Sequence, residues 1–174
     1  MARTLNNIMI DKTNKPTKLQ SWILASRPRT LPAALVPVMV GSALAIYHGI
    51  FFPAYSIVAL LCSILIQIGT NFTNDLYDYL KGTDTEERKG PLRVLASGLI
   101  SVKEMKWGIF LVFFTAFLLG LYLVYSVGIM ILWIGIFSII AGLAYTAGPF
   151  PLAYNGLGDL FVFIFFGIVG TVGT

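Results

Sequence analysis

The distribution of charged residues constrains the fold of this chain more than any other feature of its sequence. No Lys, Arg, Asp or Glu occurs in the 45 residues from Thr30 to Asn74, or in the 52 residues from Trp107 to Gly158. A helix needs roughly 20 apolar residues to cross a hydrocarbon core about 30 Å thick, so each stretch is long enough for two crossings and a turn. The pattern predicts a membrane protein built from helical hairpins.

The overall composition excludes a freely soluble domain, because 57% of the residues are hydrophobic and only 11% are charged. The first twenty residues are polar and basic, so we expect no removable signal peptide. The net charge of +4 comes from basic residues near the span ends and does not indicate a nucleic-acid partner. A single cysteine, Cys62, excludes an intrachain disulfide and is expected to be a small core residue.

We therefore expect an all-α, polytopic transmembrane bundle. Residues 1–29 form a basic amino-terminal segment, and residues 30–174 form the transmembrane domain. The expected spans are 31–50, 55–79, 107–125, 127–145 and 160–174, with a loop at 80–106. All twelve Lys and Arg residues then fall on one side of the bilayer. The positive-inside rule makes that side cytoplasmic, so the amino terminus and any active site are expected to face the cytoplasm.

A stripe of polar side chains runs down one face of the second span. Its members fall within an arc of about 100° at the helical periodicity, and they are Gln67, Asn71, Asn74, Asp75 and Asp78. Carboxylates that merely end a helix at the water interface would explain the two acids alone. They would not explain the amides up to two turns deeper, where polar groups are costly. The stripe is therefore expected to line a cavity open to the cytoplasm.

The chemistry of this stripe favours a magnesium ion. Asp75 and Asp78 are three residues apart, and Asp84 follows six residues later after a glycine. Magnesium binds through one or two carboxylates together with substrate phosphates and waters. No His or Cys joins the cluster, so zinc and copper are poor candidates. We expect a metal-bound diphosphate in the cavity, with Arg93 from the charged loop that follows pairing with the outer phosphate oxygens.

These residues resemble a known family. The pattern Asn74-Asp75-x-x-Asp78-x-x-x-Gly82-x-Asp84, followed by Gly90-Pro-Leu-Arg93, resembles the first aspartate-rich motif and loop of the UbiA superfamily of intramembrane prenyltransferases. Four features are similar to its 1,4-dihydroxy-2-naphthoate polyprenyltransferase branch: the five residues between Asp78 and Asp84, the Lys81-Gly82 pair, the segment beginning Arg27-Pro-Arg-Thr, and the segment from Tyr145 to Asp159. The resemblance extends from about Trp22 to Gly170.

The resemblance implies an enzyme that transfers a polyprenyl group from its diphosphate to 1,4-dihydroxy-2-naphthoate in menaquinone (vitamin K2) biosynthesis, with Mg²⁺ as cofactor. By the match of motifs, Asp75 and Asp78 are catalytic metal-binding acids and Asp84 is a supporting metal ligand. The implied diphosphate partners are Asn74, Lys81 and Arg93. The residues assigned to a substrate pocket are Gln67, Asn71, Tyr145, Tyr154 and Asp159.

The family also implies about nine spans and a second aspartate-rich motif on a later cytoplasmic loop. This chain ends before such a motif, so we expect it to hold the amino-terminal part of a larger site. Three alternatives remain open: a related enzyme acting on 4-hydroxybenzoate, homogentisate, a chlorophyllide or haem; an ion-coupled transporter; and an inactive truncated fragment. A transporter should carry its polar groups near the bilayer midplane. Prenyl chain length and oligomeric state are left open.

Overall fold

The computed structural model describes residues 15–82 and 93–174, and every regular element within them is a helix. The predicted all-α architecture is thus confirmed. The elements are α2 (Lys18–Ser26), η1 (Pro28–Thr30), α3 (Pro32–Tyr47), α4 (Pro53–Leu80), α5 (Val102–Val127), α6 (Met130–Ala144), η2 (Leu152–Asn155), α7 (Gly158–Val162), the π-helix η3 (Phe163–Val169) and α8 (Gly170–Val172).

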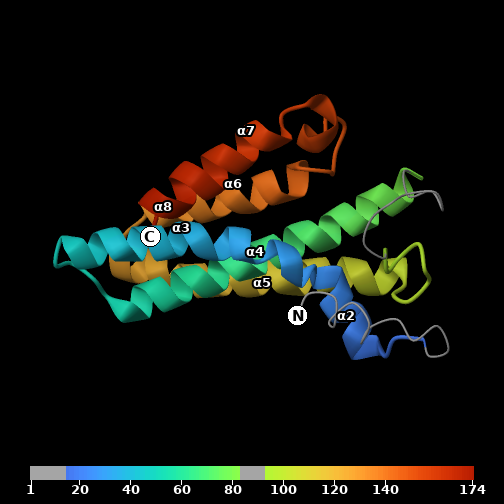
Figure 1. The fold of residues 1–174 in the computed structure, drawn as a ribbon, viewed down its shortest axis with the longest axis horizontal. Helices are drawn as coiled ribbons and strands as arrows, with labels where there is room; N and C mark the ends of the chain where they lie inside the picture. Colours follow the sequence, from blue (N-terminus) through green and yellow to red (C-terminus); the bar gives the residue numbers. More distant parts are fainter. Residues whose placement is uncertain (1–14, 83–92) are drawn as a thin grey trace.

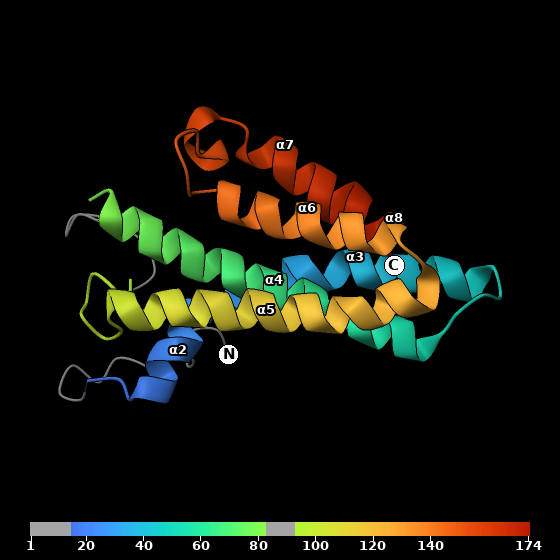
Figure 2. The same ribbon diagram turned by 180° about the vertical axis from the view of Figure 1, so that it is seen from behind.

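The helices form two hairpins that lie side by side (Figures 1 and 2). Helices α3 and α4 make the first hairpin, α5 and α6 the second, and α4 packs along α5 at the centre of the bundle. The final stretch from α7 to α8 runs back beside α6 and ends against α3. The carboxyl ends of α4 and α6 and the amino ends of α5 and α7 therefore gather at one end of the bundle. Together with α2, they form what we call the polar end.

Two of the described helices, α4 and α5, are long and apolar enough to cross a membrane. Helices α2 with η1 and α3, bent by 53° at their junction, make a third span if they are counted as one. Helix α6 and the run from α7 to α8 are apolar but shorter. Large apolar side chains cover the outside of the bundle, among them Met39, Ile57, Phe110, Trp133 and Phe137. Such a surface suits lipid rather than water.

Helix α5 begins at Val102, whereas the charge pattern placed the start of this span at Trp107. A capping box explains the earlier start. The Glu104 N–H donates to Ser101 Oγ at 3.3 Å, and the Ser101 N–H donates to Glu104 Oε2 at 2.8 Å. Lys18 of α2 lies 2.7 Å from the same carboxylate. The last residues of the predicted loop are therefore the first turn of a helix.

An apolar cluster holds the polar end together. It joins α2, α4, the segment 93–101 and the start of α5, and its buried members are Ala25, Phe72, Leu76, Val94, Leu95, Ile100 and Met105. Val94 and Ile100 are each only 1% exposed. Because these side chains are fully removed from solvent, the segment that starts at Arg93 is fixed firmly against α4.

Close contact between α4 and α5 depends on a glycine, and this yields a first prediction. A Cβ at Gly69 would lie 2.7 Å from the Phe113 ring, whereas a Cβ at Gly120 of α5 would meet nothing within 4 Å. We expect Gly69→Ala to lower the free energy of unfolding by about 1–3 kcal/mol through overpacking. Gly120→Ala should instead raise it by up to about 1 kcal/mol, because alanine favours the helix and meets no neighbour there. Unfolding titrations with SDS in mixed micelles measure both, and equal effects would contradict the tight contact.

Candidate active site

The polar stripe of α4 lies inside the bundle at its polar end. Asp75 is 2% exposed and Asp78 is 6% exposed, and the amides of Asn71 and Asn74 are also buried. The helical periodicity places these side chains on one face, and the packing of α2, α6 and the segment 93–101 covers that face. Buried carboxylates are costly unless they are paired or hydrogen-bonded, so their partners define the site.

Arg93 bridges the two acids. Its Nη2 donates a hydrogen bond to Asp78 Oδ2, and its Nη1 lies 3.6 Å from Asp75 Oδ1. The Leu95 N–H donates to the other oxygen of Asp75 at 3.4 Å, and the Tyr154 hydroxyl donates to the other oxygen of Asp78. Each of the four carboxylate oxygens thus faces a donor from the chain. The two carboxylates are thus held by a guanidinium, a hydroxyl and a backbone N–H.

The segment after α6 is tied to α4 by a second set of contacts. Thr146 Oγ1 donates to Asn74 Oδ1 at 2.6 Å. Lys81 Nζ donates to the Thr146 carbonyl at 3.0 Å and stands 4.8 Å from the centroid of the Tyr154 ring, a cation–π contact. These contacts bring residues more than 60 positions apart in the chain into one site. Tyr154 links the two basic residues, since Lys81 stands over its ring while its hydroxyl donates to Asp78, the partner of Arg93.

Two adjoining cavities meet at this site. The smaller, about 310 Å³, has the more polar lining, formed by Arg27, Asn74, Asp78, Arg93, Tyr145, Thr146, Ala153 and Tyr154. The larger, about 410 Å³, is mainly apolar and lies between α3, α4, α5, α6 and the run from α7 to α8. Arg27, Asn74 and Tyr145 line both. A compartment suited to a charged group therefore adjoins one suited to an apolar chain.

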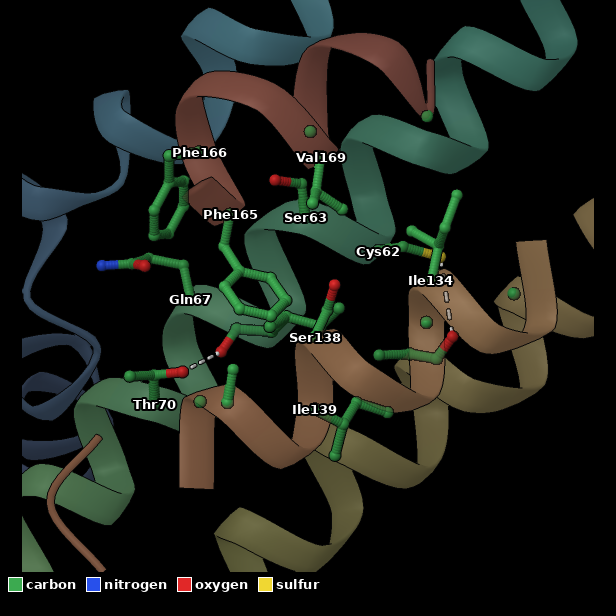
Figure 3. Close-up of a pocket in the computed structure, with 18 of the residues that line it drawn as sticks. Cys62, Ser63, Gln67, Thr70, Ile134, Ser138, Ile139, Phe165, Phe166 and Val169 are labelled. Atoms are coloured by element: carbon green, nitrogen blue, oxygen red, sulfur yellow. Dashed lines mark hydrogen bonds between the residues drawn. The ribbon is translucent and has the colours of Figure 1, made fainter. Parts of the chain in front are cut away.

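Side chains from three elements converge in the larger cavity (Figure 3). Ser63, Gln67 and Thr70 come from α4, Ser138 comes from α6, and the aromatic rings of η3 close the opposite side; the labelled rings are Phe165 and Phe166. Cys62 was expected in the core, but it is only half-buried and lines this cavity, with its Sγ 3.5 Å from the Ala116 carbonyl oxygen. The structure thus divides the stripe. Gln67 and Asn71 line only the larger cavity, Asp78 lines only the smaller, Asn74 lines both and Asp75 lines neither.

The remaining predicted site residues take different places. Asn71 lines the larger cavity and donates to the Ser26 carbonyl at 2.8 Å and to Thr30 Oγ1 at 2.9 Å, which ties α4 to the bend before α3. Asp159 is exposed in the first turn of α7 and lines neither cavity. Its role in a substrate pocket stays a prediction. Asp84, like the charged loop residues 86–90, lies outside the described residues.

Two residues of the site were not singled out from the sequence. Thr146 is 4% exposed and bonded to Asn74, and Arg27 lines both cavities. Arg27 has φ 49°, the only positive φ among the described non-glycine residues. Such a backbone costs about 1–3 kcal/mol and is often found at functional sites. Both residues lie within segments whose pattern resembled a family motif, which was the available signal.

The donor set fits a magnesium ion held jointly with phosphate. Asp75 and Asp78 offer carboxylates one helical turn apart, and Asn74 adds an amide oxygen beside them. Within residues 15–82 and 93–174, no group of three or more His, Cys, Asp or Glu residues could hold a metal. When phosphates supply further ligands to a magnesium ion, the protein usually contributes only one or two carboxylates. The site is therefore suited to a metal–phosphate complex rather than to a bare ion.

The described chain is an all-helical bundle with long apolar helices, a buried acid pair at one end and a mainly apolar cavity beside it, which defines a membrane protein. The UbiA prenyltransferase family matches residues 34–174, and the chain belongs to this family. It is an integral membrane protein, and proteins of this family generally use a divalent metal.

The chain is similar to proteins named 1,4-dihydroxy-2-naphthoate octaprenyltransferase. It is 42% identical to that of Haemophilus influenzae over 90% of this chain and 54% of the relative, and 40% identical to that of Escherichia coli over 91% and 53%. It is 30% identical to human UbiA prenyltransferase domain-containing protein 1 over 86% of this chain and 45% of the relative. The chain spans about half the length of these relatives. No solved structure matches it.

Proposed function

We propose that this protein takes part in transferring a polyprenyl group from its diphosphate to 1,4-dihydroxy-2-naphthoate, the acceptor named in its relatives. The observation that carries the proposal is the pair of adjoining cavities, one lined by Asp78, Arg27 and Arg93 and the other mainly apolar. This arrangement suits a ligand with a charged head and a hydrocarbon tail.

In the proposed reaction the C–O bond of the prenyl diphosphate breaks, and its electron pair leaves with the diphosphate. A ring carbon of the acceptor forms the new C–C bond. The carboxylate on that carbon then leaves as carbon dioxide, and its bonding electrons restore the aromatic ring. The product is demethylmenaquinone in its reduced form.

We assign roles to residues that line the smaller cavity or lie beside it, on their positions and chemistry. Asp75, Asp78 and Asn74 would hold Mg²⁺, which when bound stabilises the negative charge that develops on the leaving diphosphate. Arg93 and Lys81 would pair with outer phosphate oxygens. Tyr145 lies at the border of the two cavities, where an aromatic face shelters an allylic cation.

We also propose that the polar end faces the cytoplasm. The described Lys and Arg residues lie in α2 and η1 or beside them, at the end of α4, in the segment 93–101 and in the first turns of α5. Basic residues at one end of a bundle favour the cytoplasmic side. A diphosphate head would then enter from the cytoplasm, while its tail lies at membrane depth in the larger cavity.

The test is a transfer assay on membranes that contain the full natural chain. It uses a labelled polyprenyl diphosphate, 1,4-dihydroxy-2-naphthoate labelled at its carboxylate, and Mg²⁺ with and without EDTA. We expect prenylated product and labelled carbon dioxide in equal amounts, both lost with EDTA. Transfer to 4-hydroxybenzoate without carbon dioxide release would instead indicate another acceptor. No transfer by a folded protein would refute the proposal.

A further inference from the structure

Groups of the chain itself already pair with both acids. Asp78 accepts from Arg93 and Tyr154, and Asp75 accepts from the Leu95 N–H and faces Arg93. A metal ion needs lone pairs of these same oxygens. In the conformation described here, Arg93 therefore takes the place that a cation bound to both acids would take.

The way Arg93 is held allows its guanidinium to move without its backbone. Val94, Leu95 and Ile100 anchor the segment in the apolar cluster, and the side chain of Arg93, 12% exposed, reaches both acids. This side chain also lines the smaller cavity. A buried guanidinium that loses its carboxylates needs another anion, because an unpaired buried charge is strongly unfavourable.

We propose that Arg93 is an internal counter-ion that competes with the metal for Asp75 and Asp78 and moves to the diphosphate when the substrate complex binds. This inference rests on the proposed function of the site. Metal alone would bind weakly, since it must displace Arg93 and leave the guanidinium without an anion. Diphosphate supplies that anion. Metal and diphosphate therefore bind cooperatively, and by linkage each raises the affinity of the other by the same factor.

The competition predicts that one variant binds the metal more tightly than the parent protein does. In Arg93→Gln the metal no longer displaces a guanidinium from the acids, so its affinity in the absence of any phosphate should rise. A residue that only binds phosphate would leave that affinity unchanged when removed, and a purely structural residue would lower it. The sign of the change separates the three roles.

The experiment measures Mn²⁺ binding to the purified full natural chain in nanodiscs by equilibrium dialysis, with and without inorganic pyrophosphate. A protein-free dialysis corrects for Mn²⁺ held by pyrophosphate in solution. For the parent protein we expect pyrophosphate to raise Mn²⁺ affinity by about tenfold, within the usual range of coupled ligands. For Arg93→Gln we expect affinity without pyrophosphate to rise by a similar factor, and the effect of pyrophosphate to shrink to the part that comes from phosphate oxygens ligating the metal.

Two further variants keep the test decisive. Lys106→Gln removes one exposed positive charge near the same end of the bundle, and it should leave Mn²⁺ affinity nearly unchanged. Arg93→Lys keeps the charge but cannot bridge both acids in a forked geometry, so its Mn²⁺ affinity should lie between those of the parent and Arg93→Gln. If the glutamine variant does not fold, as judged by size-exclusion chromatography and circular dichroism, Arg93→Lys is used for the test instead.

The outcomes separate this inference from the proposed function. If Arg93→Gln or Arg93→Lys folds and binds Mn²⁺ no more tightly than the parent without pyrophosphate, the counter-ion role is refuted while the metal site stands. If the folded parent binds no Mn²⁺ under either condition, both the metal site and the counter-ion role are refuted. Prenyl transfer activity is measured separately and decides only the proposed function.

Discussion

Replacing Asp75 or Asp78 by asparagine is expected to abolish magnesium-dependent prenyl transfer by the full natural chain, with a loss of about 10³-fold or more in turnover. Asparagine is close to isosteric with aspartate but lacks the negative charge that holds the metal. Each variant also leaves Arg93 with one carboxylate instead of two. Turnover in isolated membranes, measured across a range of Mg²⁺ concentrations, tests the expectation.

A matched acid-to-amide change provides the control. Glu104→Gln removes an exposed carboxylate at the same end of the bundle, and glutamine still serves in a capping box. Its surface ion pair with Lys18 contributes little to stability, so turnover should stay close to that of the parent. Membrane insertion of all three variants is checked by carbonate extraction. Unchanged turnover in an inserted Asp75→Asn or Asp78→Asn protein would contradict the metal site.

Filling the larger cavity is expected to lower kcat/KM more for a long polyprenyl diphosphate than for a short one. Ser138 lies on the face of α6 that lines this cavity (Figure 3), and Ser138→Phe places a ring in its interior. Each CH₂ group excluded from an apolar site costs about 0.8 kcal/mol, so a few lost groups lower kcat/KM for a long polyprenyl diphosphate by roughly 10²-fold. Geranyl diphosphate, with a short tail, should lose much less.

The matched control for this variant lies on the same helix. Ile140 is 53% exposed and lines neither cavity, so Ile140→Phe adds an aromatic ring to α6 without filling the interior. Its kcat/KM should match that of the parent for both substrates. An equal loss for long and short substrates in Ser138→Phe would show that the ring disturbs the helix packing. It would then be no evidence for a tail in this cavity.

The membrane bundle followed from local features of the chain. The long charge-free stretches predicted the two hairpins, because few other folds accommodate 45 or 52 residues without a charge. The helical period placed Gln67, Asn71, Asn74, Asp75 and Asp78 on one face of α4, and they lie there in the structure. The residue at which a helix starts was predicted less accurately. A side-chain cap at Ser101 extended α5 beyond the apolar run that suggested its start.

The partners of that face did not follow from the residues of α4. Periodicity states which side chains share a face, but it does not state what packs against them. Thr146 and Tyr154 reach Asn74 and Asp78 from segments 72 and 76 residues further along the chain. The structure also divides the stripe between two cavities, which no pattern along one helix could indicate.

The sequence by itself determined the class of this protein, its helices and the acid pair, because each depends on hydrophobic length, local periodicity or a motif of neighbouring residues. Only the tertiary structure decided which groups of the chain pair with these two acids. A carboxylate buried in a membrane bundle must find its partner in space, and Asp75 and Asp78 find theirs in Arg93, Leu95 and Tyr154. That choice depends on helix packing, which brings together charges and donors from distant parts of the chain.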